Sequence, residues 1–110
     1  MSIEKAVLDE LVQGILRVLG KNVISVILYG STARGTAEKD SDVDIALIVK
    51  RPISADEDDA LADIIVDMDL KYGKVFSVID IEDSEFRKWQ NIVPFYGNVV
   101  NEGVVLWKAA

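Results

Sequence analysis

The pattern of hydrophobic and polar residues predicts helices and strands that alternate through the first half of the chain. A helical stripe of apolar side chains covers residues 3–19, and Gly20 follows it as a C-terminal cap. The β-branched run 23–29 predicts a buried strand that ends at a glycine. Residues 30–41, rich in Gly, Ser and Thr, predict a turn with room for one helical turn. Residues 42–49 predict a second strand whose polar residues lie at one end.

The next segment predicts a helix and a third strand. Pro52 ends the preceding strand, and Ser54 and Glu57 form the S-x-x-E capping-box pattern at the start of a helix. Apolar residues recur along that helix at helical spacing, and Gly73 closes it. Residues 75–81 are again mostly β-branched and predict a third strand.

The last part of the chain predicts a further helix and a short edge strand. Asp83 or Ser84 can cap the helix, which is interrupted at Pro94, and residues 104–107 predict the strand. Because helices and strands alternate, the fold class is α/β, with a small sheet of mixed direction flanked by helices. A length of 110 residues is near the commonest domain size, so we expect one domain over residues 1–110.

Charge and composition narrow the chemistry. The chain has 19 acidic and 12 basic residues, a net charge of -7, and therefore lacks the basic surface of a protein that grips a nucleic-acid backbone. It has no cysteine and no histidine, so any metal must be bound through carboxylate oxygens, which favours Mg²⁺ or Mn²⁺. The absence of histidine also removes the most common general base.

Nothing in the sequence predicts a membrane segment. The longest apolar run, residues 23–29, is far shorter than the roughly 20 residues that a spanning helix needs. The first residues are amphipathic and do not form a basic segment followed by an apolar stretch, so we expect no signal peptide. We therefore expect a cytoplasmic protein with no membrane partner.

The turn between the first two strands has the features of a phosphate site. Gly30 directly follows a buried strand, which allows a sharp turn and a close approach of the backbone to a ligand. If Ser31 opens a helical turn, free N–H groups and the positive end of the helix dipole face that ligand. Arg34 can add charged donors to the same phosphates. Its alternative is a surface ion pair with Glu38 or Asp40.

Two aspartates follow this turn at the start of the next strand. Ten residues separate Ser31 from Asp42, and Asp42 and Asp44 lie two positions apart, so their carboxylates project to one face about 6–7 Å apart. A divalent metal would relieve their repulsion and orient a triphosphate for in-line attack on its α-phosphate. An Asp-x-Asp pair alone is usually a solvated loop, but the fixed spacing to the Gly-Ser turn favours the functional interpretation.

A third acid is expected from a neighbouring strand, and Asp80 is our candidate. It lies among β-branched residues, where a carboxylate is costly unless it is paired or bound to metal. There it could bind one metal and accept the proton of an attacking hydroxyl. Its alternatives are a surface acid on an edge strand or a cap for the next helix. The acidic run within residues 56–69 is interpreted as a solvated helix face and not as a calcium site.

The combined pattern resembles a known family. Gly30-Ser31-x10-Asp42-x-Asp44 is similar to the signature of the polymerase-β-type nucleotidyltransferase superfamily. The resemblance is stronger still to its minimal (MNT) branch and extends over nearly the whole chain, through three further segments: Tyr29 to Gly35, Phe86-x-x-Trp89 with Pro94-Phe95-Tyr96, and Asn101 to Trp107.

This resemblance implies a nucleotidyltransferase (polymerase-β-like) fold and a transferase that uses ATP with two Mg²⁺ ions. It implies that Gly30 and Ser31 bind phosphate and that Asp42 and Asp44 bind both metals, with Asp80 as a less secure third ligand. It also implies a partner: members of this branch commonly act as antitoxins of helical HEPN toxins and are thought to attach AMP to a tyrosine of the toxin.

Two rival functions remain open at this stage. The chain could neutralise its partner by contact alone, with a vestigial nucleotide site. It could also modify a small molecule or a nucleic-acid end, although short length and negative charge weigh against that acceptor. The sequence leaves open the base specificity, the number of AMP units transferred, and whether the protein forms a homo-oligomer or a hetero-oligomer.

Overall fold

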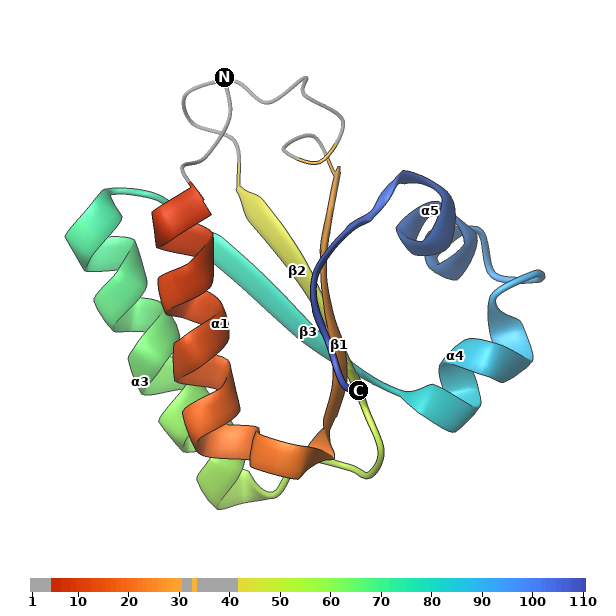
Figure 1. Ribbon diagram of the computed structural model, residues 1–110, viewed down its shortest axis with the longest axis horizontal. Coiled ribbons are helices and arrows are strands. Elements are labelled where there is room, and N and C mark those ends of the chain that lie inside the picture. Colours follow the sequence, from red (N-terminus) through yellow and green to blue (C-terminus); the bar gives the residue numbers. More distant parts are fainter. Residues whose placement is uncertain (1–4, 31–32, 34–41) are drawn as a thin grey trace.

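A computed structural model describes residues 5–30, residue 33 and residues 42–110, and shows a four-stranded sheet between two layers of helices (Figure 1). The elements are α1 (Lys5–Leu19), the short 3-10 helix η1 (Gly20–Asn22), β1 (Val23–Tyr29), β2 (Val43–Val49), α3 (Ala55–Tyr72), β3 (Phe76–Glu82), α4 (Asp83–Trp89), α5 (Pro94–Glu102) and β4 (Val104–Lys108). The predicted strands and helices are thus present, and Pro94 begins a separate helix.

The sheet has the mixed direction expected from the sequence. Its strand order is β3-β2-β1-β4. The strand β1 runs antiparallel to both of its neighbours, β2 and β4. The strands β2 and β3 run parallel, and helix α3 makes the crossover between them, as parallel neighbours require.

One face of the sheet is covered by α1 and α3 (Figure 1). The apolar stripe of α1 packs there against inward-facing residues of the strands, and Leu11, Ile15, Ile45 and Leu47 have no exposed surface. Burial of this stripe removes large aliphatic side chains from water and provides most of the core.

The opposite face is covered by α4 and α5 and has a smaller core. Ile27, Ala46, Ile48, Ile81 and Val99 are buried there, and four aromatic rings pack around them (Tyr29, Phe86, Phe95, Tyr96). Because side chains alternate along a strand, Asp44 shares this face with Ala46 and Ile48. The pair Asp42 and Asp44 was predicted at the start of this strand, and the second core therefore adjoins the predicted site.

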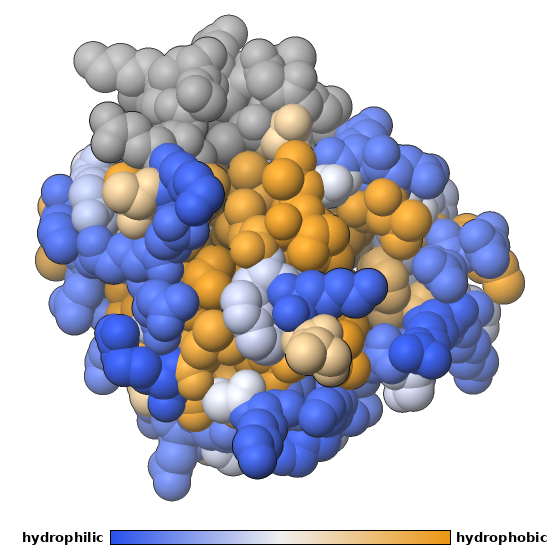
Figure 2. All heavy atoms as spheres, viewed as in Figure 1, coloured by the Kyte–Doolittle hydropathy of each residue, from blue (hydrophilic) through white to orange (hydrophobic). Residues whose placement is uncertain are grey.

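The exposed surface carries apolar side chains along the edge strand β4. Val104 and Val105 are 46% and 57% exposed. Figure 2 shows apolar residues gathered at the centre of this side of the molecule, between α1 and α5. In the part of the chain that the structure describes, no helix is both long and apolar enough to cross a membrane.

Candidate active site

The end of β1 meets the start of β2 at Gly30 and Asp44. Tyr29 and Asp44 are direct partners in the antiparallel register, so Gly30 follows immediately beside the aspartate. Gly30 has a φ of 76°, a left-handed conformation that favours glycine. A Cβ atom at this position would lie 2.5 Å from Asp44 Oδ2. The close approach of this carboxylate to the backbone therefore requires glycine for two independent reasons.

The two aspartates differ in their exposure. Asp42 is exposed just before β2, and Asp44 is half-buried on the strand. Both have interaction partners in the structure. Carboxylate oxygens are the ligands that a hard cation such as Mg²⁺ prefers, so the chemical type of these two side chains fits the expected metal. Among the residues described, no cluster of three or more acidic, histidine or cysteine side chains is close enough to hold a metal ion.

Tyr29 links the site to the second core. Its ring packs edge-on against Phe95, with centroids 5.4 Å apart. Burial and, to a lesser degree, the negative charge of Asp44 raise the pKa of its hydroxyl. The phenol therefore stays protonated at neutral pH and can donate a hydrogen bond. Its neighbours in the core hold the end of β1 in place beside Asp44.

The structure does not bring Asp80 to the aspartate pair. In the parallel register of β2 and β3, Asp80 lies beside Leu47, three positions beyond the pair formed by Asp44 and Ser77. That offset is about 10 Å along the strand. An odd number of residues also reverses the side-chain direction, so Asp80 lies on the face covered by α3, with Phe76 and Val78. The structure therefore does not group Asp80 with Asp42 and Asp44.

Asp80 was expected to bind metal because a carboxylate among β-branched residues would be costly to bury, but the structure leaves this side chain exposed. β3 is an edge strand, and Asp80 is exposed on it. The carboxylate is therefore solvated and needs no metal. The residue that β3 does place beside Asp44 is Ser77, which the sequence analysis did not single out. Only the strand register, which is a long-range property, distinguishes these two positions.

The other predicted phosphate ligands, Ser31 and Arg34, lie outside the residues that the structure describes. Their roles remain predictions. The same holds for Glu38 and Asp40, the alternative ion-pair partners of Arg34. The described part of the site thus consists of Gly30, Asp42 and Asp44, together with the neighbours that position them.

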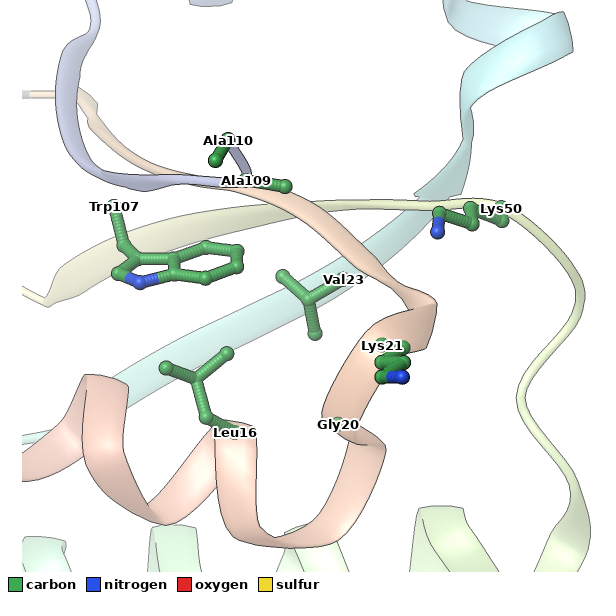
Figure 3. A pocket seen from close by; sticks show the side chains of 8 residues that line it. All are labelled: Leu16, Gly20, Lys21, Val23, Lys50, Trp107, Ala109 and Ala110. Atoms are coloured by element: carbon green, nitrogen blue, oxygen red, sulfur yellow. The ribbon is translucent and has the colours of Figure 1, made fainter.

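An apolar cavity of about 370 Å³ lies at the opposite end of the sheet (Figure 3). Leu16, Val23 and the Trp107 ring line it, and Lys21 and Lys50 stand beside them. Val23 is the first residue of β1 and Lys50 follows the last residue of β2, so the cavity is a strand length away from Gly30 and Asp44. It is not part of the candidate site.

Solved structures with the same fold include complexes of toxins with antitoxins. A toxin–antitoxin crystal structure with AMP-PNP superposes with a TM-score of 0.65 at 20% identity, over 97% of this chain and 75% of that one. A second, of a tri-AMPylated Shewanella oneidensis HEPN toxin in complex with an MNT antitoxin, has a TM-score of 0.57 at 16% identity, over 96% and 74%. These similarities confirm the predicted fold class.

Sequence comparison identifies the family. Two Methanocaldococcus jannaschii proteins are similar to this chain: "Putative protein adenylyltransferase MJ1305" and "Putative protein adenylyltransferase MJ0604". The first is 40% identical over 69% of this chain, and the match covers only 53% of that protein's length. The second is 34% identical over 97% of this chain and 100% of that protein. The model of the nucleotidyltransferase domain matches residues 9–104. The chain therefore belongs to the nucleotidyltransferase domain family, as its Gly-Ser and Asp-x-Asp pattern predicted.

Proposed function

We propose that this protein transfers AMP from ATP to a tyrosine hydroxyl of a HEPN-type toxin, in a Mg²⁺-dependent reaction, and acts as the antitoxin of that toxin. The observation that carries the proposal is the contact of Gly30 with Asp44. It joins the start of the phosphate-binding turn to the carboxylate pair, so a triphosphate held by the turn would lie against both aspartates.

Each part of the site has a role in this reaction. The backbone at Gly30, with Ser31 and Arg34, binds the phosphates, and Asp42 and Asp44 hold Mg²⁺. Bound Mg²⁺ neutralises phosphate charge and favours departure of pyrophosphate. The acceptor oxygen forms a bond to the α-phosphorus, the bond from that phosphorus to the bridging oxygen breaks, and the proton of the acceptor hydroxyl passes to water. Positioning and electrostatics account for most of the expected rate enhancement.

The choice of acceptor rests on the relatives and on charge. Both archaeal relatives are named as protein adenylyltransferases, and the Shewanella complex contains an AMP-modified HEPN toxin. A net charge of -7 disfavours a nucleic-acid acceptor, because its phosphates would be repelled. The toxin–antitoxin structure with AMP-PNP supports ATP as the donor.

The test is a labelling reaction with ATP carrying a radioactive α-phosphate, Mg²⁺ and the product of the adjacent gene, the candidate toxin. We expect label on a tyrosine of that protein. The Asp42→Asn/Asp44→Asn variant should lower labelling by at least about a thousandfold, because it removes the metal ligands. The matched control is Asp56→Asn/Asp63→Asn, which removes two charges from the exposed side of α3 and should retain activity.

Four outcomes would contradict the proposal. An unlabelled partner, or equal labelling by the Asp42/Asp44 variant, would exclude the reaction. If that variant also protected cells from the toxin as well as the wild type, the protein would act by contact alone. Labelling of a small molecule or an RNA end in the absence of any partner protein would assign a different acceptor.

A further inference from the structure

Ser77 is the side chain that the third strand presents to the aspartate pair. The parallel register places Ser77 directly beside Asp44, and neighbouring strands lie about 4.8 Å apart. Ser77 lies on the same face of β3 as Ile79 and Ile81, because side chains two positions apart share a face. Ile81 belongs to the core beneath α4 and α5. The hydroxyl therefore lies on the same face as the Asp44 carboxylate.

The geometry around Ser77 is that of a third ligand position. Asp42 and Asp44 lie at the start of β2, and Ser77 is the neighbour of Asp44 on β3, the strand that adjoins this side of β2 in the described part of the chain. A carboxylate at residue 77 would lie within about 5 Å of the Asp44 side chain. Asp80 cannot take its place, because it lies three residues along β3 and faces the opposite side of the sheet.

We propose that Ser77 occupies the third ligand position of the metal site, so that this chain binds one divalent ion firmly through Asp42 and Asp44 and a second ion weakly. The inference rests on the proposed function, since it concerns the same site. A neutral hydroxyl is a poorer ligand for Mg²⁺ than a carboxylate and offsets none of the ion's charge. The chain therefore supplies only two negatively charged ligands at this site, and two divalent ions would need further negative ligands to bind firmly.

This arrangement makes activity depend on the concentration of free Mg²⁺. The firm site fills first together with the nucleotide. The second ion binds only at higher concentration, because its negative ligands are shared with the first. Replacing Ser77 by aspartate adds the missing charge on the correct face, and the variant should fill both positions at a lower metal concentration.

The test is a titration of the full chain with Mn²⁺ in the presence of AMP-PNP, which needs no acceptor. Four variants are compared with the wild type: Ser77→Asp, Ser77→Asn, Asp80→Asn and Asp42→Asn/Asp44→Asn. We expect Ser77→Asp to bind the second ion at least about tenfold more tightly, as the charge of the ligand set determines affinity. Ser77→Asn has the size of aspartate without its charge and should gain far less affinity than Ser77→Asp. Asp80→Asn should bind Mn²⁺ as the wild type does. Thermal melting of each variant checks that it is folded.

The outcomes separate this inference from the proposed function. If the wild type binds Mn²⁺ through Asp42 and Asp44, but Ser77→Asp gains no affinity, Ser77 is not at the third position. Weaker binding by Asp80→Asn would overturn the inference in favour of Asp80. If neither the wild type nor Ser77→Asp binds Mn²⁺ with the nucleotide, both the inference and the proposed function fail.

Discussion

At the scale of single residues, we expect a change at Gly30 to lower both the stability of the fold and the binding of nucleotide at the site. Gly30→Ala introduces strain from a positive φ and a contact between Cβ and the Asp44 carboxylate. We expect the variant to lose roughly 1–3 kcal/mol of unfolding free energy. Nucleotide binding should fall as well, because the carboxylate must move. Urea unfolding and a titration with Mg²⁺ and AMP-PNP measure the two effects.

The control for Gly30→Ala is Gly73→Ala. Gly73 has a similar φ of 61° at the C-terminal end of α3, and a Cβ there would meet no described atom within 4 Å. The control should therefore lose about 1 kcal/mol of stability from strain alone and bind nucleotide normally. Equal nucleotide binding by the two variants would show that the contact of Gly30 with Asp44 has no functional role.

The site residues differ in how far the sequence could identify them. Gly30, Asp42 and Asp44 lie close together along the chain, so their spacing and the periodicity of the strand are enough to predict that they share one site. The identity of the third position depends on how β3 pairs with β2. Ser77 and Asp80 both lie in one short strand of mostly apolar residues, and either could face the site until the register is known.

At the scale of elements, α3 begins with a complete capping box. The Ser54 hydroxyl accepts a hydrogen bond from the Glu57 N–H, and the Glu57 carboxylate accepts one from the Ser54 N–H. Arg51 donates two further hydrogen bonds to that carboxylate. These local interactions explain why the start of α3 is predictable from sequence, since Ser54 and Glu57 lie only three positions apart along the chain.

The charge at Glu57 should make the stability of α3 depend on pH. The hydrogen bonds from Arg51 and from the Ser54 N–H lower the pKa of the Glu57 carboxyl from 4.5 to about 2. A lowered folded-state pKa means that the stabilisation is complete above pH 4.5 and is lost as the pH falls toward 2. Glu57→Gln keeps the capping box but removes the charge. We expect it to be less stable than the wild type near neutral pH, with a difference that shrinks below pH 4.5.

Urea unfolding of both proteins between pH 7 and pH 3 measures this difference. Asp63→Asn removes a charge from the same helix outside the capping box and serves as the control. A gap between wild type and Glu57→Gln that stays constant down to pH 3 would mean that the ion pair with Arg51 does not stabilise the fold.

The connections and layers of the fold were less predictable than its elements. The strand β1 coincides with the predicted run 23–29, because a buried β-branched stretch is a local signal. The assignment of α1 and α3 to one face, and of α4 and α5 to the other, follows from strand order and crossover direction. Those features depend on pairing between distant segments, which no local pattern specifies.

At the scale of the whole molecule, we expect negative charge to control nucleotide binding. The chain has a net charge of -7, and two of its carboxylates, those of Asp42 and Asp44, lie where a triphosphate would bind. The nucleotide alone should therefore be repelled, and a divalent ion should be required to hold it. AMP-PNP without metal is expected to leave the melting temperature unchanged. With Mg²⁺, a ligand concentration of 100 times Kd stabilises the folded state by about 2.7 kcal/mol, or about 10 °C in a domain of this size.

Thermal melting with AMP-PNP, with and without Mg²⁺, tests this requirement, and EDTA should return the melting temperature to its starting value. The Asp42→Asn/Asp44→Asn variant should show no shift with Mg²⁺, since it lacks the ligands that join metal to protein. Asp56→Asn/Asp63→Asn has the same net charge as that variant but an intact site, so its shift should match the wild type. A shift that survives EDTA would mean that binding does not require the metal. A shift that is equal in the two double variants would mean that overall charge and not the carboxylate pair governs binding. Because both variants differ from the wild type by two charges, only the position of those charges can explain a difference between them.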